Sequence, residues 1–314
     1  MEETVKGTVA LELQGVSKSY ADVRAVDDLS FLVKAGEIFG LLGPNGAGKT
    51  TTIRMALDII KPNTGQISVL GGPMTEEKKS RIGYLPEERG LYDDMTLLDT
   101  LLFLGQLKGL SRQTARERAE TYLREVELWE AHDRKIEALS QGMNQKAKFV
   151  AGTMHEPELL IVDEPFSGLD PVNTRIIKDL LLRMRDQGTA IVMSTHQMHR
   201  VEEMCERILL IDRGRQVLYG PLDDVRTRFA TNTVAVDLKG CLEEVPGVER
   251  LNPHNGGYHM TLREGVQPEV LLQTLVNMPE VTVERFERVQ ASLEDIFVQV
   301  VGREVSWDEQ VEPT

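Results

Sequence analysis

Short apolar runs and stretches of helical periodicity alternate along roughly the first two thirds of the chain. The apolar runs EIFGLL, ELLIVDEP, TAIVMSTH and RILLIDRGRQVLYG each predict a buried strand, and VNTRIIKDLLLRMRDQG predicts a helix between the second and third runs. This strand–helix–strand order indicates a parallel sheet. Residues 8–34 instead alternate apolar and polar positions and break at YADV, so they predict an antiparallel hairpin.

Two later regions change the pattern. After the further strands GQISVLGG and RIGYLPEE, residues 96–150 carry helical periodicity rich in Leu, Glu and Arg and predict a helical insertion. Beyond Pro221, strands are predicted at TVAVDL, VERL, YHMTL and VTVERFERV, with helices at 268–277 and SLEDIFVQVVG. We therefore expect a first domain over 1–222, a small α+β domain over 223–302 and a mobile acidic tail over 303–314.

Composition narrows the class of protein. A chain of 314 residues fits two domains, and its hydrophobic fraction of 41% is ordinary for a globular core. The net charge of −14 argues against a nucleic-acid partner, and two cysteines, Cys205 and Cys241, indicate a reducing compartment. The N-terminus lacks a basic leader pattern, and no apolar stretch is long enough to span a bilayer. Any membrane role is expected to come through a partner.

A glycine-rich loop follows the first buried strand. In GPNGAGKT, the glycines Gly43, Gly46 and Gly48 allow backbone amides to turn around an anion where the helix TTTIRMALDII begins. The spacing fits G-x-x-x-x-G-K-[ST], in which Lys49 reaches the β- and γ-phosphates and Thr50 ligates Mg²⁺. The alternative is an ordinary glycine-rich turn whose lysine is solvated. The strand before the loop and the helix after it favour the phosphate site.

Acidic and histidine side chains follow two of the other predicted strands. The strand predicted at LLIVDEP ends at Asp163, which we expect to contribute to the coordination of Mg²⁺. Glu164 follows it and is placed to orient or deprotonate an attacking water. MSTH places His196 at the same edge of a parallel sheet, where ligands gather. An acidic strand end and a structural histidine are the alternatives, and the phosphate loop in the same chain favours the catalytic interpretation.

Taken in order, these motifs resemble those of the ATP-binding subunits of ABC transporters over the first domain. GPNGAGKT is similar to the family's phosphate loop, LSQGMNQK to its signature, SGLDP to the loop carrying Asp170, and STH to its switch histidine. The resemblance implies an α/β P-loop NTPase cassette with a mixed sheet core, an antiparallel β subdomain and a helical subdomain. It also implies ATP contacts from a larger set of residues: Tyr20, Asn45, Gly46, Gly48, Lys49, Thr50, Thr51, Ser140, Gly142 and Asp170.

Two positions depart from the commonest family pattern. The signature usually reads LSGGQ, whereas Gln141 and Met143 replace a glycine and the glutamine here. The loop after IGYLP normally carries glutamine, and this chain has Glu87, which we interpret as a metal-facing and coupling residue because carboxylates also ligate Mg²⁺. The alternatives are a solvated Glu87 and, for Tyr20, a half-buried strand residue in place of an adenine-stacking one.

The resemblance implies a cytoplasmic ATPase that powers export by a separate integral membrane permease. Through that partner it is expected to lie peripherally on the inner face of the cell membrane. Each ATP is expected to lie between the phosphate loop of one copy and the signature of another, in a homodimer or a paired subunit. IGYLPEERGLYDDMTLLDTL and the C-terminal extension look most like the branch with sodium-extrusion and drug-resistance subunits. A soluble ABC ATPase acting on ribosomes or DNA, and an ATP-regulated C-terminal binding module, are the rival interpretations.

Overall fold

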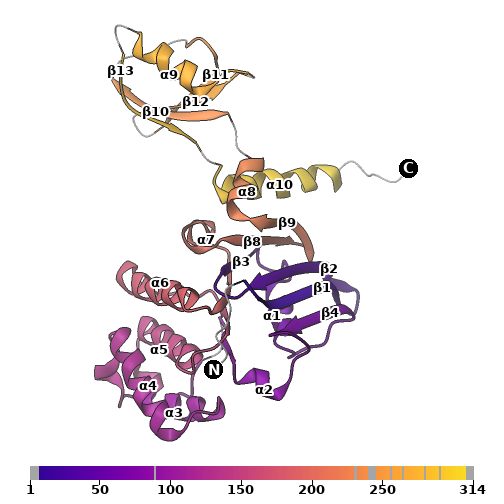
Figure 1. Cartoon of the computed structure of the whole chain (residues 1–314), viewed down its shortest axis with the longest axis vertical. Helices are drawn as coiled ribbons and strands as arrows, with labels where there is room; N and C mark the ends of the chain where they lie inside the picture. The colour runs from indigo at the N-terminus through magenta and orange to yellow at the C-terminus, as the bar shows by residue number, and fades with distance from the viewer. Residues whose placement is uncertain are drawn as a thin grey trace. The chain divides into compact units, whose positions relative to one another are not determined.

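The computed structural model describes residues 7–87, 90–229, 232–239, 245–254, 257–263, 265–278, 281–289 and 291–308. The chain divides into two compact units, Met1–Leu222 and Asp223–Thr314, whose elements are labelled in Figure 1. Among the described helices, none has both the length and the apolar character needed to cross a bilayer.

A six-stranded sheet forms the centre of the first unit. Its strand order is β5-β6-β7-β3-β8-β9, with β9 antiparallel and the others parallel. The strands are β3 (Ile38–Leu42), β5 (Ile82–Leu85), β6 (Leu159–Asp163), β7 (Ala190–Thr195), β8 (Arg207–Asp212) and β9 (Arg215–Pro221). Every residue of β3, β6 and β7 is buried, which explains their unbroken apolar runs and confirms the predicted parallel core.

One strand prediction needs correction at the edge of this sheet. The run RILLIDRGRQVLYG forms two antiparallel strands, β8 and β9, instead of a single strand. Arg213 and Gly214 join them with φ of 45° and 80°, the left-handed pair that a tight two-residue hairpin turn requires. The arginine–glycine pair marks the turn, although the apolar pattern runs through it.

A second, three-stranded sheet flanks the first and has the order β2-β1-β4. Its strands β1 (Val9–Tyr20) and β2 (Val23–Lys34) pair antiparallel, which confirms the predicted hairpin, and β4 (Thr64–Val69) pairs with β1. Helix α1 (Lys49–Ala56) contacts all three strands and shares one apolar core with them. The helix ends earlier than its apolar pattern suggests, because Asp58 adopts a left-handed φ of 58°.

The predicted helical insertion is confirmed as a cluster of three helices. These are α3 (Leu97–Leu107), α4 (Arg112–Glu125) and α5 (Gln141–Thr153), with short 3₁₀ turns at Trp129–Ala131 and Ile136–Ala138. Thr96, Ser111 and Ser140 each begin one of them by accepting a hydrogen bond from the backbone N–H three residues on. Figure 1 shows the three helices together, with α6 (Pro171–Asp186) beside α5, while α2 (Glu76–Lys79) and α7 (Met198–Met204) are short.

The second unit has its own four-stranded antiparallel sheet in the order β11-β12-β10-β13. Its elements are α8 (Leu222–Arg228), β10 (Thr233–Lys239), β11 (Val248–His254), β12 (Gly257–Leu262), α9 (Pro268–Val276), β13 (Thr282–Arg288) and α10 (Leu293–Asp308). Val234, Val236, Met260 and Leu271 lie in one buried cluster. Helix α10 runs into the predicted acidic tail, while 309–314 and Cys241 lie outside the described residues.

A close approach between β5 and α5 positions the loop that follows β5. A Cβ added at Gly83 would lie 2.3 Å from the Gly152 carbonyl oxygen of α5 and 2.7 Å from Leu160 Cδ1. Neither the helix backbone nor the packed leucine can yield without shifting its neighbours. Glycine at position 83 therefore sets how closely the helical cluster lies against the sheet.

We predict that Gly83→Ala lowers the free energy of unfolding by about 1–3 kcal/mol, the usual cost of overpacking a buried contact. Chemical denaturation of the purified chain measures the change. Gly90→Ala is the matched control, because a Cβ there meets no atom within 4 Å in the described part of the chain. Equal stability of the Gly83 variant and the control would show that β5 and α5 are not in such close contact.

Candidate functional site

The phosphate loop leaves β3 and enters α1 through backbone that only glycine tolerates. Gly43 and Gly48 have φ of 150° and 109°, and a Cβ at either would come within 2.5 Å of a backbone carbonyl oxygen, of Ile211 and Ala25 respectively. No side chain caps the amino end of α1 at Gly48. Its first-turn amides and its positive dipole end therefore face the loop, as an anion site requires.

Lys49 lies at the start of α1 with only 9% of its surface exposed. Its Nζ donates hydrogen bonds to the carbonyl oxygens of Gly43 at 2.7 Å and Pro44 at 3.1 Å. Burial lowers the pKa of Lys49, and the nearby carboxylates of Glu164, Asp163 and Glu87 oppose that shift. The ammonium thus lies inside the loop and among three carboxylates, all of which the sequence singled out.

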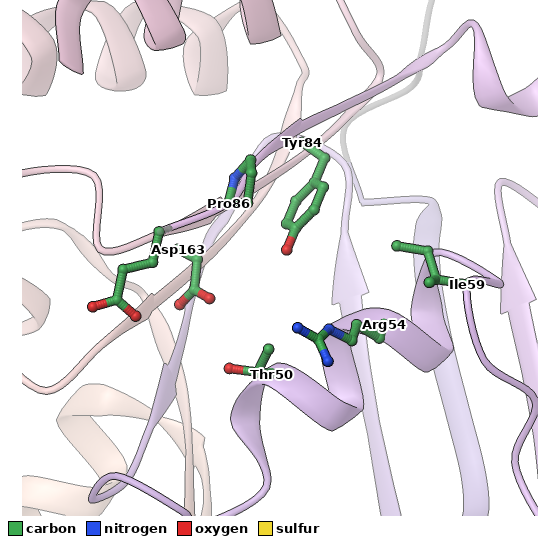
Figure 2. Close-up of a pocket in the computed structure, with 7 residues that line it drawn as sticks. Thr50, Arg54, Ile59, Tyr84, Pro86 and Asp163 are labelled. Atoms are coloured by element: carbon green, nitrogen blue, oxygen red, sulfur yellow. The ribbon is translucent and has the colours of Figure 1, made fainter. Parts of the chain in front are cut away.

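A pocket of about 260 Å³ opens beside this lysine. Figure 2 shows Thr50 and Arg54 on α1, facing Asp163 at the end of β6 and Tyr84 at the end of β5. Pro86, Glu87 and Ile59 complete its lining. The structure therefore brings the three predicted metal-facing residues, Thr50, Glu87 and Asp163, to one pocket, together with Arg54, which sequence reasoning had not considered.

The electrostatics of this pocket suit a divalent cation. Burial raises the pKa of Asp163, and the adjacent carboxylates of Glu87 and Glu164 raise it further. Hard oxygen donors are what Mg²⁺ prefers, and it takes only one or two protein carboxylates when phosphates and water supply the rest. Within the described residues no three His, Cys, Asp or Glu side chains form a metal cage. The donors present therefore fit a metal that is bound jointly with a phosphorylated ligand.

Glu164 is held in place from several sides. Its φ of 48° is left-handed, a strained conformation for a residue with a side chain, and its backbone N–H donates to the Ser194 carbonyl oxygen at 2.9 Å. Thr195 Oγ1 donates to Glu164 Oε2 at 3.0 Å, and the His196 backbone N–H donates to Oε1 at 2.9 Å. The end of β7 therefore fixes the carboxylate that follows β6.

Glu164 and His196 contact each other directly, since His196 Nδ1 lies 2.6 Å from Glu164 Oε1. The sequence pattern places both residues at one edge of the sheet but does not predict a contact between them. Sequence reasoning also missed Thr195, whose hydroxyl orients the same carboxylate. The only available signal was its position inside STH, because the contact joins strands more than thirty residues apart in the chain.

The signature residues lie at the amino end of α5. Ser140 is exposed, and its Oγ accepts a hydrogen bond from the Met143 N–H at 3.3 Å. Gly142 packs near the Gly168 carbonyl oxygen, and Asp170 caps α6 by accepting from the N–H groups of Val172 and Asn173 at 2.9 Å. In the described residues, no hydrogen bond or ion pair joins Ser140, Gly142 or Asp170 to the phosphate loop of the same chain.

The remaining predicted nucleotide contacts lie on the exposed side of the loop and on β1. Asn45 and Gly46 are exposed, and Thr51 is half-buried on α1. Tyr20 ends β1 with 46% of its surface exposed, and Lys18 Nζ lies 5.4 Å from the centre of its ring. The exposed part of the ring leaves room for a base to stack, and adenine stacking by Tyr20 stays a prediction.

Comparison with known proteins finds a matching family model for each of the two units. Residues 26–167 match the family model described as ABC transporter, and residues 220–301 match the model of the ATP-binding protein DrrA1-3-like C-terminal domain. An ABC transporter ATP-binding protein of Bacillus subtilis, YhaQ, is 36% identical over 297 residues, covering 93% of this chain and 98% of its own length.

Two further similarities concern export and fold. A Nod factor export ATP-binding protein I of Burkholderia orbicola is 31% identical over 302 residues, with 94% of this chain and 98% of that protein covered. The solved structure of an ATP-binding subunit of an ABC transporter shares 33% identity with a TM-score of 0.67, covering 70% of this chain and 93% of that one. With the phosphate loop and the acidic strand end at one sheet edge, this chain belongs to the ABC transporter family, as an ATP-hydrolysing ATP-binding subunit of the DrrA-like exporter type.

Proposed function

We propose that two copies of this chain, or this chain and a paired subunit, close on ATP and power export by a separate membrane-spanning permease. The observation that carries the proposal is the position of Ser140. It exposes a capped helix end whose amides can bind phosphate, while the phosphate loop of the same chain lies on another subdomain. Two such chains facing each other complete two pockets, each with a loop from one copy and a signature from the other.

The residues of the proposed ATP site have different roles in binding and catalysis. Lys49, with the loop residues Asn45, Gly46, Gly48 and Thr51, binds and orients the phosphates. Thr50, Asp163 and Glu87 would hold Mg²⁺, which would neutralise phosphate charge. Tyr20 stacks on the adenine ring, and Ser140, Gly142 and Asp170 of the other copy close the pocket. Catalysis in this arrangement is chiefly positioning and electrostatic stabilisation.

Glu164 keeps the capacity to act on water despite its three hydrogen-bonding contacts. A carboxylate accepts about four hydrogen bonds, and Thr195 and His196 fill three of these positions. The remaining lone pair is available to orient or deprotonate an attacking water. His196 Nδ1 contacts Glu164, so the other ring nitrogen, Nε2, remains to face a γ-phosphate.

An apolar groove beside Glu87 supports a membrane partner. It holds about 230 Å³ and is lined in part by Leu91, Leu104 and Leu107, the last with 65% of its surface exposed. We place a segment of the permease in this groove, which puts the chain at the inner face of the cell membrane. A soluble ABC ATPase on ribosomes or DNA is the second candidate, and the net charge of −14 disfavours it.

Copurification from gently solubilised membranes tests the proposed partner. We expect a tagged full-length chain to recover an integral membrane protein at a fixed ratio. Leu107→Glu should reduce that recovery, because it places a charge on the exposed rim of the apolar groove. The matched control is Val172→Glu on α6. Val172 is an apolar residue outside the groove, and its exposure of 69% is close to that of Leu107. Ribosomal proteins or DNA in place of a membrane protein would contradict the proposal.

Hydrolysis tests the role of Glu164. Glu164→Gln keeps an amide oxygen to accept from Thr195 but removes the base, so we expect turnover to fall about 100-fold or more while ATP still binds. Lys49→Ala should weaken ATP binding itself. Phosphate release and binding of a fluorescent ATP analogue measure the two effects. Near-normal turnover by Glu164→Gln would rule out Glu164 as the base.

A further inference from the structure

The loop from Glu164 to Asp170 lies against the amino-terminal half of α5 in the same chain. Gln145 Nε2 donates to the Pro165 carbonyl oxygen at 3.1 Å and lies 3.4 Å from that of Glu164. At the other end of the loop, a Cβ on Gly168 would fall 2.6 Å from Gln141 Nε2 and 3.0 Å from Gln141 Cγ. The side chain of Gln141 therefore lies directly over the α-carbon of Gly168.

These contacts come from one face of the helix. Gln141 and Gln145 are four residues apart, so they project from α5 on the same side, and Lys148 follows them on that face. Lys148 Nζ lies 3.5 Å from the Glu87 carbonyl oxygen. A single polar stripe, Gln141–Gln145–Lys148, thus touches the loop that begins with Glu164 and the loop that carries Glu87.

The loop needs such support because it begins in strained left-handed backbone at Glu164, whereas the positive φ of Gly168 is one that glycine adopts without strain. Glu164 has φ of 48° and Gly168 has φ of 73°. A strained conformation persists only where its surroundings fix it, and the end of β7 fixes Glu164 itself. Gln145 and Gln141 of α5 add contacts to the residues that follow, at Pro165 and at Gly168.

We propose that Gln141 is a positioning residue for Glu164. The signature usually carries glycine at this position. Here the Gln141 side chain covers Gly168 and holds the loop that begins with Glu164. In this way the amino end of α5 positions the Glu164 carboxylate. The inference rests on the role proposed above for Glu164. It gives the departure in the signature a function inside its own chain, distinct from any contact that Ser140 and Gly142 make with a nucleotide on a second copy.

Steady-state hydrolysis by the purified full-length chain tests this role. Gln141→Ala removes the atoms over Gly168, and we expect kcat to fall about tenfold with KM for ATP changed less than twofold, because a displaced base affects chemistry more than binding. Gln141→Met keeps the Cγ and the length of the side chain and should restore most of kcat. Gln113→Ala, on exposed α4, is the matched control and should leave both constants unchanged.

A double-mutant cycle makes the contact itself measurable. Gly168→Ala and Gln141→Ala each disrupt the contact between these two positions. Because the second change then has little left to disrupt, we expect the fall in kcat of the double variant to be smaller, by about threefold or more, than the product of the two single falls. If the fall in kcat of the double variant equals the product of the two single falls, the inference is wrong. An unchanged kcat in Gln141→Ala would also overturn it. Glu164→Gln is measured in parallel: if it alone is inactive, the proposed base stands while the role of Gln141 falls.

Discussion

One ammonium among three carboxylates is the feature on which the rest of the site depends. The parallel strands β3, β5 and β6 end at the same edge of the sheet, so Lys49, Glu87, Asp163 and Glu164 meet there. This cluster carries excess negative charge in a partly buried place, and burial, with the neighbouring carboxylates of Glu87 and Glu164, raises the pKa of Asp163. The proposed Mg²⁺, bound together with the phosphates of ATP, would offset that excess charge.

The contacts of Glu164 show how the fold positions the carboxylate that we propose as the catalytic base. Thr195 and His196 hold the carboxylate from the end of β7, while α5 contacts the following loop through Gln145 and Gln141. Glu164 and the loop after it therefore have contacts with both the sheet and the helical subdomain. If Glu164 is the base, as we propose, a rotation of α5 relative to the sheet would act on the loop that carries it and would couple subdomain closure to water activation.

Local patterns predicted much of this site, and contacts across the chain did not follow from them. Lys49 and Thr50 follow from the spacing of one loop, and Asp163 from one apolar run before an acidic pair. The contacts of Thr195 with Glu164 and of Gln141 with Gly168 join distant segments, and no spacing encodes them. The end of α1 was missed for a related reason, because backbone geometry at Asp58 stops the helix while its apolar periodicity continues.

Crosslinking between two chains tests the shared ATP site most directly. In a background without Cys205 and Cys241, one chain carries Ser140→Cys and a differently tagged chain carries Asn45→Cys, both with Glu164→Gln to block hydrolysis. A short thiol crosslinker should join the two tags when ATP and Mg²⁺ are present, and much less without nucleotide, because closure brings the signature of one copy to the phosphate loop of the other. Equal yields with and without ATP, or reactive cysteines that never join, would contradict the shared site.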